Sequence, residues 1–242
     1  MKILFALTAL SCSTFAMAQT TRPTQTVEKF TTRITIDVDL NHLVYLPPDY
    51  KKDPAKRWPL VIFLHGAGER GSNIEKVKSW GPPKLVEGGK DFPFVLISPQ
   101  CAEGKWWEPA AINSLLDKAL ATYAIDPVRV YLTGISMGGY GTWATAMAYP
   151  ERFAAIVPIC GGGDAWRASR LKDLPVWAFH GEKDKIVPIQ RSEEMVDAVK
   201  KAGNADVKFT RYPDAGHDSW TEAYNTAELY EWMLSHKRKP SQ

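Results

Sequence analysis

The sequence lacks a stripe of basic residues. Its 242 residues include 30 lysines and arginines against 27 aspartates and glutamates, which gives a net charge of +3. Binding to nucleic acid relies on clustered positive charge, so we expect no nucleic-acid partner. The sequence also lacks histidines and cysteines at the spacing of metal ligands, and we therefore expect no metal.

A hydrophobic run long enough to stay in a bilayer is missing as well. The apolar stretch Ile3–Ala18 falls short of the roughly 20 residues that a membrane helix needs. Lys2 precedes it and the triplet Ala16-Met17-Ala18 ends it, the pattern of a secretory signal peptide. We expect a signal peptide over residues 1–18, a linker over 19–26 and one domain over 27–242, in a secreted or periplasmic protein without a stable membrane anchor.

Cysteine is scarce. Removal of the signal peptide would leave only Cys101 and Cys160, each of which follows a predicted buried strand. An oxidising compartment permits a disulfide, but nothing in the sequence brings the two within bonding distance. We expect two separate, partly buried thiols.

Short apolar runs alternate with helical patterns along the chain. The runs, each bounded by glycine, proline or polar residues, are 60–64, 94–97, 130–132, 154–159 and 176–179. Apolar residues recur at helical spacing over 112–123, around Val196 and Val199, and over 229–236. This order predicts an α/β fold with a mostly parallel sheet flanked by helices. Alternation within residues 29–50 predicts an antiparallel pair of strands.

A serine lies between two glycines in the stretch "GISMG", residues 134–138. The stretch follows the predicted strand "VRVYL" and precedes a helical pattern. In a strand-to-helix turn of this kind the flanking glycines leave room for a tight bend, and the serine is presented on a strained backbone. Ser136 is therefore the candidate nucleophile.

A serine nucleophile needs a base, and the base needs an acid that orients it. Asp184 and His217 follow Ser136 in the chain order acid then base, and each comes just after an apolar run. Other carboxylates compete for the acidic role: Glu182, Asp164, Asp214 and Asp218. His65 and His180 end predicted strands, and we expect them to be structural hydrogen-bonding groups. His42 and His236 are expected on the surface.

The negative charge that develops during acyl transfer needs two backbone donors. Met137, directly after the serine, supplies one amide. The loop "HGAGERG" after the first buried strand supplies the other, with Gly66 permitting close approach and Ala67 offering its N–H. Met137 and Ala67 are the predicted oxyanion hole.

Taken together, these stretches resemble those of the α/β-hydrolases. The chain is similar to secreted bacterial carboxylesterases of the dienelactone-hydrolase, phospholipase/carboxylesterase and feruloyl-esterase-like group, some of which are labelled predicted peptidases. The matching stretches run from residue 60 to the C-terminus and include "LHGAGERG", "ISPQC", "GISMGGYGTW", "FHGEKDKIVP" and "YPDAGHDSW". Ser136 replaces the cysteine nucleophile of dienelactone hydrolases. The resemblance implies an α/β-hydrolase fold and ester hydrolysis without metal or cofactor.

Nine tryptophans are many for this length. Trp58, Trp143, Trp177 and Trp232 lie on strand or helix patterns and are expected in the core. Trp107 and Trp220 fall on loops at the predicted catalytic edge, where they are candidates for walls that stack on a phenolic acyl group or a sugar. The expected substrate is a small-molecule or polysaccharide-linked ester with a short-chain or hydroxycinnamoyl group.

Two other functions remain open at this point. One is a serine peptidase of the prolyl-oligopeptidase type, and the other is a non-catalytic carbohydrate-binding protein on the same fold. The connection from Cys160 to Leu174 is too short for a large cap domain, so we expect an open site. The segment 67–92 is polar and charged, with few apolar residues to cover a long acyl chain.

Export gives a first testable prediction. Protein recovered from the periplasm or the medium is expected to begin at Gln19, as measured by mass spectrometry of its N-terminus. An intact Met1 or a lipid-modified Cys12 would contradict cleavage after Ala18.

Overall fold

The structure, a computed structural model, describes residues 25–35 and 37–238. The predicted signal peptide and most of the predicted linker lie outside these residues. Contacts divide the chain into two units, residues 1–37 and 38–242. Within the first unit, residues 25–35 and 37 are exposed and form no helix or strand. The predicted domain start at residue 27 falls in this first unit.

A seven-stranded sheet forms the centre of the second unit. Its spatial order is β1-β3-β2-β4-β5-β6-β7. The antiparallel edge strand β1 places His42 opposite Pro99 of β3, and every other neighbouring pair is parallel. The strands are β1 His42–Tyr45, β2 Trp58–Leu64, β3 Val95–Pro99, β4 Ile125–Ile135, β5 Ala155–Ile159, β6 Val176–Gly181 and β7 Val207–Tyr212.

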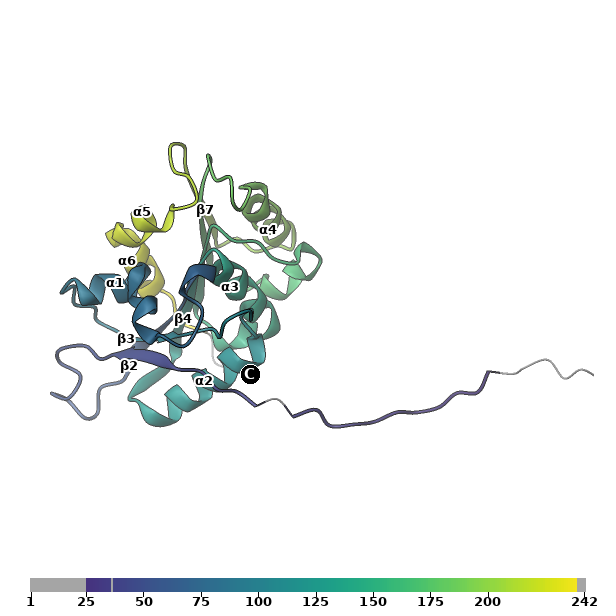
Figure 1. The fold of residues 1–242 in the computed structure, drawn as a ribbon, viewed down its shortest axis with the longest axis horizontal. Helices are drawn as coiled ribbons and strands as arrows, with labels where there is room; N and C mark the ends of the chain where they lie inside the picture. Colours follow the sequence, from purple (N-terminus) through teal and green to yellow (C-terminus); the bar gives the residue numbers. More distant parts are fainter. Residues whose placement is uncertain (1–24, 36, 239–242) are drawn as a thin grey trace, which may run out of the picture. The chain divides into compact units, whose positions relative to one another are not determined.

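Helices cover both faces of this sheet (Figure 1). One face packs against α2 Pro109–Thr122, α3 Met137–Ala148 and α4 Gln190–Lys201, and the other against α1 Gly81–Glu87, α5 Trp220–Asn225 and α6 Ala227–Ser235. Strand β2 shows why both faces are apolar. Leu60, Ile62 and Leu64 point to the first face and Val61 and Phe63 to the second, and all five are buried.

Four short 3₁₀ helices complete the unit: η1 Ala67–Glu69, η2 Ile74–Ser79, η3 Pro150–Arg152 and η4 Ala165–Leu171. The connection from Cys160 to Leu174 contains only η4, so the part of the chain that the structure describes has no large cap, as predicted. No helix among the described residues is long and apolar enough to cross a membrane.

One expectation for the N-terminal half was wrong. The antiparallel pair predicted within residues 29–50 does not form, because the described residues before His42 contain no strand and β1 pairs with β3 instead. The polar segment 67–92 contains the two short helices η1 and η2. It also contains α1, whose first residues Gly81, Pro82 and Pro83 are buried.

The other predicted elements are present. All five apolar runs are strands, and the three helical patterns became α2, α4 and α6. Gly203, at φ +95°, follows the end of α4 in a conformation that favours glycine. The four tryptophans expected in the core are buried. The parallel strands place the segments after β2, β4, β6 and β7 at one edge of the sheet, where the candidate residues lie.

Candidate active site

Ser136 occupies a sharp turn between the end of β4 and the start of α3. Its backbone has φ 52° and ψ −116°, a left-handed conformation that is costly for a residue with a side chain. Its N–H donates to Ile159 O of the neighbouring strand β5 at 3.0 Å. The turn is therefore anchored to the sheet while the serine side chain projects from it.

The glycines on either side of Ser136 are required by close backbone contacts. A Cβ on Gly138 would lie 1.9 Å from the carbonyl oxygen of Leu64, at the end of β2. A Cβ on Gly134 would lie 2.4 Å from the carbonyl oxygen of Gly138. The first turn of α3 can approach the sheet this closely only without these two side chains.

His217, in the loop between β7 and α5, connects the serine to a carboxylate. Its Nε2 lies 2.9 Å from Ser136 Oγ and its Nδ1 lies 2.7 Å from Asp184 Oδ2. A carboxylate accepts hydrogen bonds, so Nδ1 carries the proton and Nε2 accepts from the serine hydroxyl. The structure thus brings together the three residues that the sequence predicted for this arrangement.

Asp184 follows β6, and its side chain is buried. Oδ1 accepts from the backbone N–H groups of Ile186 at 2.8 Å and Val187 at 2.9 Å. Oδ2 faces two imidazoles, that of His217 and that of His180, whose Nε2 lies 3.2 Å away. Three hydrogen bonds, with the His180 ring beside them, therefore hold the carboxylate in one orientation toward His217.

His180 is the structural hydrogen-bonding group that we expected. Its Nε2 lies 2.8 Å from Val187 O and its Nδ1 lies 2.7 Å from Ser192 Oγ. Burial lowers the pKa of His180, which favours the neutral ring. Its contact with Asp184 was not predicted. The signal available in the sequence was the i, i+4 spacing of His180 and Asp184 across the end of a strand.

The two predicted oxyanion donors lie on either side of Ser136. Met137 is the first residue of α3 and Ala67 the first residue of η1. A Cβ on Gly66, the residue before Ala67, would lie 3.6 Å from Ser136 Cβ, so this loop borders the serine directly. Neither amide donates to an acceptor within residues 25–35 and 37–238. The two amides remain the predicted donors to an oxygen at the serine.

This geometry agrees with the comparison with known proteins. The phospholipase/carboxylesterase family matches residues 109–230, a stretch that contains Ser136, Asp184 and His217. The chain belongs to this family.

Individual relatives of this chain share only a minority of its residues. A bifunctional acetylxylan esterase/xylanase from Neocallimastix patriciarum is 27% identical over 201 residues, which cover 78% of this chain and 27% of the relative. A probable feruloyl esterase C from Aspergillus terreus is 23% identical over 180 residues, 72% of this chain and 66% of the relative. The solved structure of a thermostable esterase is 34% identical with a TM-score of 0.73, covering 83% of this chain and 60% of that one.

The two tryptophans predicted as site walls are both buried. Trp107 is 6% exposed, and its indole N–H donates to His65 O at 3.1 Å. It packs beneath the loop after β2, so the prediction of an open wall was wrong for this residue. Its neighbour Trp106 is 65% exposed and contacts Tyr140 edge to face, with ring centroids 6.2 Å apart. Trp106 is the tryptophan of this pair that faces solvent.

Trp220 contacts the candidate base. Its ring lies edge to face with the imidazole of His217 at 5.2 Å and with Trp80 at 5.7 Å. A cavity of about 70 Å³ adjoins it, lined by Trp80, Gly81, Lys84, Leu85, Trp220, Thr221, Tyr224 and Asn225. Trp220 therefore belongs to the surroundings of the site, although it is only 9% exposed.

Cys160, Asp184 and His217 have ligand atoms within 4.8 Å of one another, a distance compatible with a metal ion. Cys160 is buried directly after the end of β5, and this burial raises the pKa of its thiol far above the ordinary value. A metal would need the thiolate and would have to separate His217 from Asp184. These groups fit a hydrogen-bonded pair beside a protonated thiol better than a metal site. Cys101 and Cys160 are free, as predicted, and both are buried.

The close contact at Gly138 gives a stability prediction. Gly138→Ala is expected to lower the free energy of unfolding by about 3 kcal/mol or more, because the new methyl group overlaps Leu64 O and the backbone must move. The measurement is urea unfolding followed by circular dichroism. Gly68→Ala is the matched control, since a Cβ there meets nothing within 4 Å. Equal stability of the two variants would contradict the close approach.

Proposed function

We propose that this chain is a serine carboxylesterase that works through an acyl-enzyme. The observation that carries the proposal is the continuous hydrogen-bonded series from Asp184 through His217 to a serine on a strained turn. Binding alone would not require these three groups to be hydrogen-bonded to one another, whereas nucleophilic catalysis requires that arrangement.

In the first half-reaction Ser136 Oγ attacks the ester carbonyl carbon while His217 Nε2 accepts the hydroxyl proton. The carbonyl oxygen becomes an oxyanion held by the N–H groups of Ala67 and Met137. The C–O bond to the alcohol then breaks, and the alcohol leaves with the proton from His217. Asp184 stabilises the imidazolium that exists between these two steps.

In the second half-reaction water attacks the acyl-enzyme and gives a proton to His217 Nε2. The same two amides hold the second oxyanion. The bond between the acyl group and Ser136 then breaks, Oγ recovers the proton from His217, and the carboxylic acid is released. No other group is needed to balance protons or electrons.

We propose short-chain acyl or hydroxycinnamoyl esters as substrates, in small molecules or attached to plant polysaccharide. The names of the acetylxylan esterase and feruloyl esterase relatives support this choice. The small size of η4, in the place of a cap, supports access for a bulky polymer. Export remains part of the proposal. It depends on the pattern of residues 1–18, which lie outside the described residues.

Replacing the nucleophile tests the mechanism. Ser136→Ala is expected to lower kcat on a p-nitrophenyl ester by about 10⁴-fold or more and to abolish fluorophosphonate labelling. Adding His217→Ala should cost little more, because the two residues act as a unit. Circular dichroism controls for folding. Near-native turnover in Ser136→Ala would refute the acyl-enzyme, and faster cleavage of aminoacyl amides than of esters by the wild type would favour a peptidase.

Acyl length provides a second test. Long acyl chains gain about 0.8 kcal/mol per methylene only where apolar walls bury them. The connection from Cys160 to Leu174 contains only η4, so it supplies no cap domain that could bury a long acyl chain. We expect kcat/KM to be highest for acetyl to butyryl or hydroxycinnamoyl esters, measured on a panel of p-nitrophenyl and methyl esters. A maximum at decanoyl or longer esters, or a rate jump above the solubility limit, would contradict an open site.

A further inference from the structure

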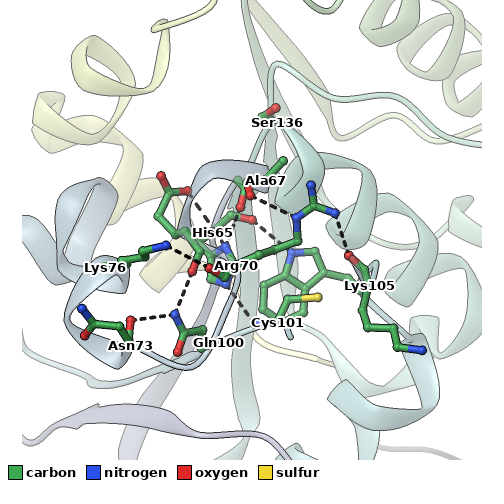
Figure 2. Close-up of polar contacts among 12 residues, drawn as sticks. His65, Ala67, Arg70, Asn73, Lys76, Gln100, Cys101, Lys105 and Ser136 are labelled. Atoms are coloured by element: carbon green, nitrogen blue, oxygen red, sulfur yellow. Dashed lines mark hydrogen bonds and ion pairs between the residues drawn. The ribbon is translucent and has the colours of Figure 1, made fainter. Parts of the chain in front are cut away.

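The loop after β2 is held by side chains that donate to its carbonyl oxygens (Figure 2). The indole of Trp107 bonds to His65 O at 3.1 Å and the guanidinium of Arg70 bonds to Ala67 O at 3.0 Å. The amide of Gln100 bonds to the carbonyls of Glu69 at 2.8 Å and Asn73 at 2.7 Å. Such a loop has little freedom to rotate its peptide planes.

One of these contacts acts on the peptide that carries a proposed oxyanion donor. His65 Nδ1 lies 2.6 Å from the carbonyl oxygen of Gly66. The Gly66 carbonyl and the Ala67 N–H belong to the same planar trans peptide, so they point in opposite directions. The Gly66 carbonyl oxygen faces the buried ring of His65 and therefore points toward the interior. The Ala67 N–H, on the opposite side of the peptide, consequently points away from the interior. Figure 2 shows Ala67 between His65 and Ser136.

The other ring nitrogen of His65 determines its tautomer. The backbone N–H of Cys101 donates to His65 Nε2 at 3.0 Å, so Nε2 accepts and Nδ1 carries the proton. Burial lowers the pKa of His65 to about 4. The charged groups that face the ring are Glu69, with Oε2 at 4.0 Å from Nδ1, and Arg70, which disfavours a second positive charge. His65 therefore stays neutral at neutral pH, with its one proton directed at Gly66 O.

We propose that His65 is a positioning residue whose Nδ1–H, by holding the Gly66 carbonyl inward, directs the Ala67 N–H at the oxyanion formed on the Ser136 adduct. This inference rests on the proposed function, because the oxyanion exists only if an acyl carbonyl bound to Ser136 becomes tetrahedral during ester hydrolysis. The alternative role for His65 is packing, since its ring also contacts Trp107 at a centroid distance of 4.8 Å.

Two substitutions separate these roles. In His65→Asn the side-chain amide nitrogen can occupy the place of Nδ1 and still donate to Gly66 O. In His65→Gln the longer side chain fills more of the ring's volume and can accept from Cys101 N–H, but it offers no donor at the Nδ1 position. Positioning predicts that asparagine works better than glutamine, whereas packing predicts the opposite.

The measurement is steady-state hydrolysis of p-nitrophenyl acetate. His65→Gln is expected to lower kcat by about 10²-fold or more, the effect of losing one oxyanion donor, while KM changes by less than about threefold. His65→Asn should retain kcat within about tenfold of the wild type. An alkyl boronic acid forms a tetrahedral adduct on serine. Its inhibition should weaken more in His65→Gln than in His65→Asn. Asn204→Ala is the control, because it removes a buried amide that donates to Leu171 O and Leu174 O. This variant is expected to leave kcat unchanged.

The proposal would be overturned if kcat fell equally in the two His65 variants or fell further in His65→Asn. A change in KM with kcat unaltered would also overturn it. If neither variant folds, ¹⁵N NMR of the wild-type histidines decides. A neutral Nδ1–H tautomer for His65 supports the inference, and an Nε2–H tautomer overturns it. The failure of the proposed function is distinguishable, because wild-type protein would then show neither turnover nor fluorophosphonate labelling.

Discussion

The close approach of the first turn of α3 to the end of β2 is the contact on which the site depends. Gly138 packs against Leu64 O so tightly that no side chain fits between them. This contact brings the end of β4 next to the loop that follows β2 and leaves Ser136 in a left-handed conformation. The same approach places Gly66 beside the serine, which makes the loop amide available to it.

Both ends of the site are rigid for a common reason. Asp184 accepts from two backbone amides and from His217, with the ring of His180 beside it. The Gly66–Ala67 peptide is held by a neutral imidazole whose tautomer is determined by Cys101. Buried acceptors that are fully satisfied have one favourable orientation, so little reorganisation remains to occur during reaction. Three histidines thus have three separate tasks: His217 contacts the nucleophile, His180 supports the acid, and His65 supports the loop.

The surroundings of the site separate a covered side from an open side. On the covered side α1 and α5 bring Trp80 against Trp220, and Trp220 against His217. On the open side the connection after β5 contains only the seven-residue η4 in place of a cap, and Trp106 is exposed to solvent. A polymer-linked ester requires such an open approach, whereas a long free acyl chain would gain little from it.

The sequence by itself determined the parallel sheet, the turn at Ser136 and the order of nucleophile, acid and base. These features are encoded locally, in apolar runs of three to six residues and in glycines within two positions of the serine. Only the tertiary structure decided which strand β1 would pair with, that Trp107 would be buried rather than exposed, and that the Cys101 amide would determine the tautomer of His65. The physical reason is that such contacts depend on sheet register and helix packing, which join residues far apart in sequence: His217 and Asp184 are 33 positions apart, and Trp107 and His65 are 42 apart.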